Sequence, residues 1–283
     1  MAITPDGKTA FVANPLSATV STIDVKTRTK HPTDIAVGSV PIGAAVTPDG
    51  KTLFVVNGGS GTVSTIDVKT RTKNATDIPV GTNPRGVAVT PDGKTAFVTN
   101  ANFGATLFPS GDSVSTIDVK TRAKNPNDIA VGSLPTQVAI TPDGKTAFVT
   151  NGGSGTVSTI DVKTRTNHFT GIALGQGVAI TPDGKTAFVG GVESVSTIDV
   201  KTGTKHPGDI AVGPFEGAGV TITPDGKTAL VTNGLGSVST IDVKTRTKNP
   251  TDIPVGAAPD LGGGHAVSPV TGTNNPRDQG ARS

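Results

Sequence analysis

The hexapeptide Thr-Pro-Asp-Gly-Lys-Thr occurs six times in this chain of 283 residues. The copies begin at Thr4, Thr47, Thr90, Thr141, Thr181 and Thr223. Successive copies are therefore 43, 43, 51, 40 and 42 residues apart. A period of this size is typical of repeat architectures, in which each unit buries its apolar surface against its neighbours. The chain is expected to fold as an array of similar units.

Each unit contains four short strand candidates. In the third unit they are residues 85–90, 95–100, 114–119 and 128–132, which are rich in β-branched residues and bounded by Gly, Pro, Asn or Asp. The hexapeptide between the first two predicts a hairpin turn, since Pro restricts φ, Asp hydrogen-bonds locally and Gly accepts a left-handed conformation. Four strands in about 43 residues is the size of a propeller blade.

We therefore predict an all-β fold, a β-propeller of four-stranded antiparallel blades with six recognisable repeats. The propeller is expected to span residues 1–256. Its repeats cover about 1–43, 44–86, 87–137, 138–177, 178–219 and 220–256. Residues 257–272 read as a degenerate partial repeat, because residues 264–269 echo residues 86–91, and the polar residues 273–283 are predicted to be disordered. Six blades would close by direct packing of the sixth on the first; the alternative is a seven-bladed propeller with a degenerate or truncated seventh blade.

The second strand of most units ends in a tetrapeptide that resembles the motif of a known family. It reads Phe-Val-Thr-Asn at residues 97–100 and 148–151, with variants in the other units. With the Pro-Asp-Gly turn and the Ile-Asp element in the same order, the chain resembles the YVTN-type β-propeller repeat proteins, related to a lactonase-like superfamily and similar in architecture to WD40 propellers. The resemblance implies a propeller that serves as a surface, periplasmic or secreted bacterial binding or scaffold module, or, in a related seven-bladed group, a lactonase.

Composition excludes several classes of function. The absence of cysteine excludes disulfides and thiol catalysis, and no apolar run approaches transmembrane length. The net charge of +3 arises from lysines and arginines that alternate with aspartates at repeat positions, so no nucleic-acid partner is expected.

A periplasmic, secreted or cell-surface location is favoured for a parent protein, although Met1 falls within the first repeat and no signal peptide precedes it, as in a fragment.

Length varies in only some of the connections. The first and third turns keep constant spacing in all units, whereas the second turns and the crossings between units do not. From Asn57 to Val63 there are six residues, from Asn100 to Val114 fourteen, and from Gly191 to Val195 four. In a four-stranded meander these variable connections share one side of the ring, which we predict to be a binding face because loops on a rigid scaffold carry recognition.

Residues without counterparts in most units gather in these connections. Those chosen as candidate binding residues are Arg85, Phe103, Phe108, Asp112, Glu193, Phe215 and Glu216. The aromatic members would anchor a ligand if exposed, but the insertion could instead bury its own pair of Phe side chains. The charged members could equally be solvated loop residues. A lactonase-type site would require Glu193, Glu216 and Arg85 to converge on the central channel with Gln137 or Gln176.

The favoured interpretation is a monomeric, non-enzymatic binding or scaffold propeller that recognises a protein or small-molecule ligand through the variable side. We assign no catalytic residue, no cofactor and no metal site, because no His-x-x-x-His spacing or calcium-loop pattern occurs. Histidines such as His31 replace Asn at equivalent repeat positions. The alternatives are a lactonase-like hydrolase with its site at the central channel, and a structural array or truncated fragment without independent activity.

Overall fold

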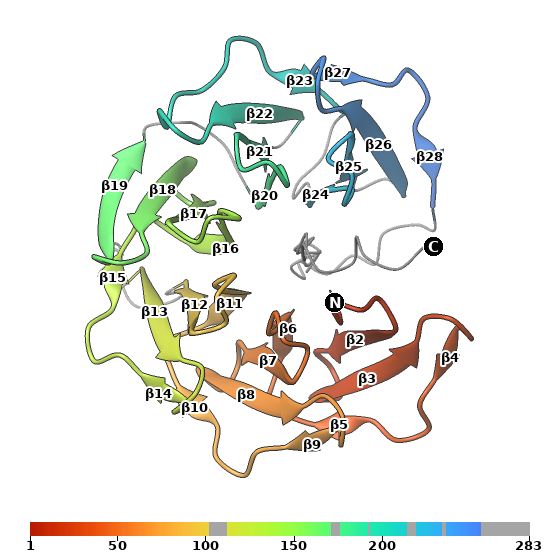
Figure 1. The fold of residues 1–283 in the computed structure, drawn as a ribbon, viewed down its shortest axis with the longest axis vertical. Coiled ribbons are helices and arrows are strands. Elements are labelled where there is room, and N and C mark those ends of the chain that lie inside the picture. Colours follow the sequence, from red (N-terminus) through yellow and green to blue (C-terminus); the bar gives the residue numbers. More distant parts are fainter. Residues whose placement is uncertain (102–111, 171–175, 192, 214–218, 234–235, 256–283) are drawn as a thin grey trace, which may run out of the picture.

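The structure is a computed structural model that describes residues 1–101, 112–170, 176–191, 193–213, 219–233 and 236–255. Six antiparallel sheets are arranged around a common axis as the blades of a propeller (Figure 1). Each sheet is a meander whose first strand lies innermost. No helix occurs among the described residues. The all-β propeller of four-stranded blades expected from the sequence is confirmed.

The strands follow the repeats closely. The innermost strands are β1 (Ala2–Ile3), β6 (Pro41–Val46), β11 (Pro84–Val89), β16 (Pro135–Ile140), β20 (Gly177–Ile180) and β24 (Val220–Ile222). The second strands are β2 (Thr9–Asn14), β7 (Thr52–Asn57), β12 (Thr95–Asn100), β17 (Thr146–Asn151), β21 (Thr186–Gly190) and β25 (Thr228–Asn233). The third strands are β3 (Thr19–Asp24), β8 (Thr62–Asp67), β13 (Ser113–Asp118), β18 (Thr156–Asp161), β22 (Ser194–Asp199) and β26 (Ser237–Asp242).

The outermost strand differs from its predicted form. In blades 1, 2, 3 and 6 it is broken into two short segments that both pair with the third strand, namely β4 (Thr29–Lys30) and β5 (Ile35–Ala36), β9 (Thr72–Lys73) and β10 (Ile78–Pro79), β14 (Ala123–Lys124) and β15 (Ile129–Ala130), and β27 (Thr247–Lys248) and β28 (Ile253–Pro254). The sequence predicted only the second segment. In blade 5 an isolated bridge at Lys205 precedes β23 (Ile210–Ala211).

Blade 4 has a continuous outer strand, β19 (Thr166–Thr170), that pairs with β18 throughout. The other units carry Asp before the final Ile, and in most of them a Pro interrupts the strand, whereas the fourth reads Asn-His-Phe-Thr-Gly-Ile. Pro has no backbone N–H to donate, and the Asp of the other units draws the backbone out of register. The fourth unit has neither residue here, so the hydrogen-bond ladder between β18 and β19 continues.

The hydrophobic core lies between blades. Phe54 of β7 is fully buried and packs with Val98 and Ile117 of the next blade, and the same arrangement recurs at the other junctions. The repeat Phe residues are 0% exposed in all five blades that have one. Backbones also approach closely near the axis: a Cβ added to Gly43 would lie 2.3 Å from the Arg85 carbonyl oxygen, so glycine is required there. Each blade is therefore stabilised by its neighbours.

Successive blades are in contact from blade 1 to blade 6 through their inner strands. Among the described strands, blades 6 and 1 share no contact of comparable extent, and they lie on either side of one sector of the ring (Figure 1). The direct packing of the sixth unit on the first that six blades would require is therefore absent from the described residues.

Candidate binding face

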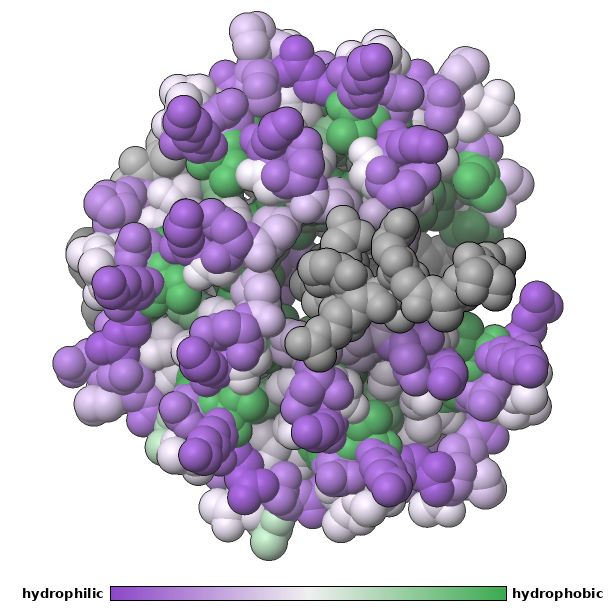
Figure 2. Space-filling view, in the orientation of Figure 1, coloured by the Kyte–Doolittle hydropathy of each residue, from purple (hydrophilic) through white to green (hydrophobic). Residues whose placement is uncertain are grey.

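The meander places four kinds of connection on two faces of the ring. The first and third turns of every blade lie on one face, which we call the turn face. The second turns and the crossings between blades lie on the other, which we call the loop face. The view in Figure 2 shows mostly hydrophilic groups, with hydrophobic groups in separate patches around the ring. No extended apolar surface covers the described part of this view.

The first turns of the turn face share one set of hydrogen bonds. In blade 3 the Thr90 hydroxyl donates to the Asp92 carboxylate at 2.6 Å, and the Lys94 N–H donates to the same carboxylate at 3.0 Å. Gly93 between them has a φ of 71°, which favours glycine. The Thr hydroxyl to Asp bond has the same length in all six turns. The hydrogen bond from Thr90 lowers the pKa of Asp92.

The third turns are equally uniform. The Thr121 N–H donates to the Asp118 carboxylate at 2.7 Å, which lowers the pKa of Asp118. Arg122 follows with a φ of 58°, and the fifth blade has Gly203 at this position with a φ of 68°. The repeated aspartates of the turn face are thus held as hydrogen-bond acceptors for their own turns. They are structural groups rather than a reactive cluster.

A polar network crosses most blades from the second strand to the outer strand. In blade 2 the Asn57 amide donates to the Ser64 hydroxyl at 2.9 Å, and Ser64 donates to Asp77 at 2.9 Å. Lys73 completes the network by binding Asp77 at 2.7 Å. The same four positions are joined in blades 1, 3 and 6. This network holds the second segment of the broken outer strand.

In blade 3 the Asn that ends the second strand fixes the inner layer of the loop face. Asn100 is 0% exposed; its amide donates to Ser113 at 3.2 Å and Ser115 at 2.9 Å, and its carbonyl oxygen accepts the Gly81 N–H at 3.0 Å. A Cβ on Gly81 would lie 2.5 Å from the Asn100 side chain, and Gly38 and Gly132 lie similarly close to the Asn of the next blade, which explains the Gly at these three unit ends. Asn100 therefore fastens the preceding crossing to its own blade.

Three predicted binding residues lie among the described residues. Arg85 is half-buried on β11, where burial lowers the pKa of its guanidinium. Asp112 is 7% exposed and accepts the Leu134 N–H at 3.0 Å, so its carboxylate fixes the crossing to blade 4. Glu193 is exposed before β22. Arg85 and Asp112 belong to blade 3 and Glu193 to blade 5, which are separated by blade 4.

The other predicted binding residues, Phe103, Phe108, Phe215 and Glu216, lie outside the described residues. Gln137 lies on β16 and Gln176 precedes β20, both near the inner strands. Among the described residues, no group of three or more His, Asp or Glu side chains could hold a metal ion. The described residues also contain no apolar helix of membrane-spanning length.

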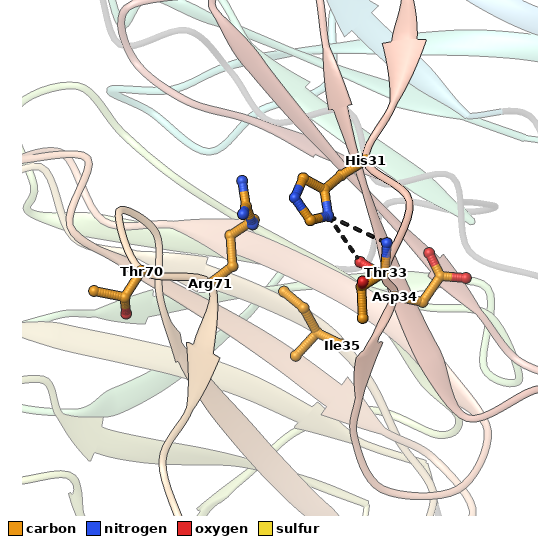
Figure 3. A pocket seen from close by; sticks show the side chains of 6 residues that line it. All are labelled: His31, Thr33, Asp34, Ile35, Thr70 and Arg71. Carbon is orange, nitrogen blue, oxygen red and sulfur yellow. Dashed lines mark hydrogen bonds between the residues drawn. The ribbon is translucent and has the colours of Figure 1, made fainter.

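The sequence did not predict a small pocket between blades 1 and 2 (Figure 3). Its volume is about 220 Å³, and it is lined by His31, Thr33, Asp34, Ile35, Thr70 and Arg71. The Thr33 N–H donates to His31 Nδ1 at 3.2 Å. At the next junction Arg122 donates to Asn74 at 2.6 Å across the equivalent positions. The signal in the sequence is the replacement of that Asn by His31.

Comparison with known proteins supports the class of protein that the fold defines, a β-propeller. A family model described as "Lactonase, 7-bladed beta-propeller" matches residues 43–173. A search of the curated proteins found no match. The matches to solved structures number 1677 chains, so the fold by itself assigns no function.

Two of these structures are similar over most of the chain. One is "Kuenenia stuttgartiensis Hydrazine Synthase", with 28% sequence identity and a TM-score of 0.73, covering 86% of this chain and 76% of the other. The second is "a functionally unknown protein from Desulfotomaculum acetoxidans DSM 771", with 16% identity and a TM-score of 0.74, covering 89% of this chain and 82% of the other. The family match covers residues 43–173 only, and together with these neighbours it supports the β-propeller fold.

Proposed function

We propose that this protein is a non-enzymatic binding or scaffold propeller that recognises a protein or small-molecule ligand through its loop face. The observation that carries the proposal is the contrast between six turns with the same hydrogen bonds and a set of second turns and crossings with different lengths. Variation confined to one side of a rigid scaffold is the usual basis of recognition by propellers.

The fixed inner layer of the loop face supports this proposal. Asn100 and Asp112 hold the two ends of the longest second turn, residues 101–112, at defined points of blades 3 and 4. A loop with anchored ends presents its side chains with less loss of conformational entropy on binding than a free segment. Phe103 and Phe108 lie within this loop and are the proposed aromatic anchors, with Arg85 and Glu193 as polar contacts.

An exported or cell-surface location in a bacterium is part of the proposal. The chain has no cysteine to be oxidised outside the reducing cytoplasm. The repeated Asp side chains are hydrogen-bonded within turns and within the polar networks of the blades. The surface that differs from blade to blade is therefore the loop face, where we place the partner. Monomeric binding is the simplest arrangement.

A loop-graft variant tests the proposal. Residues 101–111 are replaced by Gly-Gly-Ser, which restores the second-turn length of blade 2 and keeps Asp112. The immobilised protein, the loop-graft variant and the turn-face control K94A are each incubated with a surface-protein extract of the source organism. Binding that K94A retains and the loop graft loses is expected; partners that the loop graft binds equally well would contradict a role for this loop.

A lactonase is the second candidate, because the matching family model carries that name. Attack of water on a lactone carbonyl requires a group that accepts the proton of the water, and Glu193 is the exposed carboxylate available for this among the described candidates. Acid release from a panel of γ- and δ-lactones of sugar acids distinguishes the two functions. We expect no rate above buffer; a rate that falls about a hundred-fold or more in E193Q would favour the hydrolase.

A further inference from the structure

The pocket between blades 1 and 2 lies on the outer rim of the ring. Residues 31–34 join β4 to β5 in blade 1, Ile35 begins β5, and Thr70 and Arg71 precede β9 in blade 2 (Figure 1). None of the lining residues belongs to a second turn or to a crossing between blades. A ligand bound here would therefore be separate from the one proposed for the loop face.

The equivalent junction of blades 2 and 3 shows what occupies these positions when Asn is present. There Arg122 donates to the Asn74 carbonyl oxygen at 2.6 Å. The Asn74 amide in turn donates to the hydroxyl of Thr65, which is 0% exposed, at 2.8 Å. One Asn side chain thus gives an acceptor to the Arg of the next blade and a donor to a buried Thr of its own blade.

At the junction of blades 1 and 2, His31 replaces this Asn and satisfies neither group. The Thr22 hydroxyl, equivalent to that of Thr65, is buried and has no hydrogen-bond partner among the described residues. The guanidinium of Arg71, equivalent to Arg122, makes no hydrogen bond or ion pair within the described part of the chain. The pocket lies between His31 and Arg71, where the next junction has its bond to the Asn oxygen.

The His31 ring presents a donor on the side of this arginine. The Thr33 N–H donates to Nδ1, so the ring proton is on Nε2. Protonation turns Nδ1 into a donor to the Thr33 carbonyl oxygen at 3.2 Å, and Nε2 keeps its proton. In Figure 3 Nδ1 is directed at Thr33 and Nε2 lies on the side of Arg71. The junction of blades 5 and 6 has the same pair, His206 and Arg246, but there Nδ1 has no hydrogen-bond partner among the described residues, so the ring is not oriented in this way.

The charge of Arg71 is fixed in place and is not compensated. Its backbone has a φ of 57°, and its N–H donates to the Asp67 carbonyl oxygen at 2.8 Å. Asp34, the one acid that lines the pocket, is already paired with Lys30 at 2.8 Å. The pocket therefore has two N–H donors and a single net positive charge, which are the properties of a site for a monoanion.

We propose that this pocket binds the carboxylate of a small organic acid or of an acidic side chain. One carboxylate oxygen accepts from the Arg71 guanidinium, in the role of the Asn74 oxygen at the next junction. The other oxygen accepts from His31 Nε2–H, and both bonds are strengthened by charge. Asp34 in the wall disfavours a dianionic phosphate. Ile35, 9% exposed, offers apolar surface to the methylene group that carries the carboxylate.

The test is an NMR titration of the isotope-labelled full chain with propionate. Binding is followed at the backbone amides of Thr33 and Arg71 and at the ring nitrogens of His31, with β17 and β18 as a reference for folding. Propionamide has nearly the same shape without the charge and is the control ligand, and inorganic phosphate tests the class of anion. A short peptide with one internal Asp and blocked ends represents an acidic side chain.

Three variants accompany the parent protein. H31N places at this junction the Asn that the next junction already has, so its own carbonyl oxygen engages Arg71 in place of the ligand. R71Q removes the charge. R122Q is the matched control, because Arg122 is already bonded to Asn74.

Propionate should shift the three sets of signals to saturation in the parent protein and in R122Q, and propionamide should not. H31N and R71Q should each weaken binding about ten-fold or more while the reference strands keep their signals. Tighter binding of the peptide than of propionate assigns the site to an acidic side chain, and the reverse order assigns it to a free acid; both orders support the proposal.

Three results would overturn the proposal. The first is the absence of a saturable shift with both propionate and the peptide. The second is equal binding of propionate by the parent and H31N, or an equal response to propionamide. The third is saturation by phosphate without a response to either carboxylate.

Discussion

The turn face and the loop face are built from the same six repeats, yet they use hydrogen bonds differently. On the turn face every first turn repeats the hydrogen bonds of Thr90 and Asp92. The first turns all have the same length in the six blades, and so do the third turns. On the loop face Asn100 fixes the inner layer in blade 3, and the second turns and crossings vary in length from blade to blade. The repeated residues of the turn face therefore stabilise the scaffold. The connections of the loop face can change in length with little loss in the free energy of unfolding.

Acid is expected to give the largest effect, because it acts on the turn-face carboxylates and on the polar networks together. Hydrogen bonds from Thr27, Thr90 and Thr121 lower the pKa values of Asp24, Asp92 and Asp118 in the fold. A carboxylate whose folded pKa lies below its unfolded value of about 3.9 contributes stability above that pH and loses it as the pH falls through the folded pKa.

In the networks, the bond from Lys30 lowers the pKa of Asp34, and Lys248 does the same for Asp252. The free energy of unfolding, measured by denaturant titration from pH 7 to 2, should therefore be steady down to about pH 4 and fall steeply below it. The same slope should appear in N100A, whose side chain does not titrate. A stability that is unchanged between pH 4 and 2 would contradict the structural role of these carboxylates.

The N100A substitution should produce the next effect, a loss of about 3 kcal/mol in the free energy of unfolding. It removes three hydrogen bonds in a buried site: the Gly81 N–H loses its acceptor, and the Ser113 and Ser115 hydroxyls lose the amide that donates to them. The matched control is N14A, because Asn14 is half-buried and, among the described residues, donates to Thr19 and Ser21. Its loss should be about 1 kcal/mol. Equal losses would show that the crossing is not fastened by this Asn.

The turn face should respond less to a single change. Removing the acceptor in D92A leaves the exposed Lys94 N–H to water, while the buried Thr90 hydroxyl keeps the Thr95 carbonyl oxygen as an acceptor at 3.2 Å, so a loss of about 1 kcal/mol is expected. K94A is the control, since Lys94 is 80% exposed and lies 3.6 Å from Asp92, and its effect should be close to zero. Thermal unfolding of both variants provides the comparison; a larger loss in K94A would place the stabilisation in the ion pair instead.

Much of the fold could be predicted because each repeat carries its own turn chemistry. The second strand predicted at residues 95–100 is β12, and the third was displaced by one residue from β13. The broken outer strand could not be predicted, since Ser115 and Asp128, which form its network, are thirteen residues apart and belong to different strand candidates. The half-buried state of Leu230 likewise could not be predicted, because the burial of this position depends on a neighbouring blade rather than on the local sequence.

The candidate site was less accessible to prediction. Arg85, Asp112 and Glu193 are predicted to bind a ligand because most other units have no equivalent residue. A residue without equivalents can also stabilise the scaffold, however. Asp112 does so by accepting the Leu134 N–H. The pocket at His31 and Arg71 was missed for the opposite reason, because His31 occupies a repeat position where Asn is usual.

The division between the two faces is tested most directly by paired changes in chain length. In one variant the loop graft replaces residues 101–111 by Gly-Gly-Ser; in the other, two Gly residues are inserted between Asp92 and Gly93. The account predicts that the loop graft stays within about 1 kcal/mol of the parent in its free energy of unfolding, whereas the insertion loses about 3 kcal/mol or more. Equal losses in the two variants, or a larger loss in the loop graft, would contradict it.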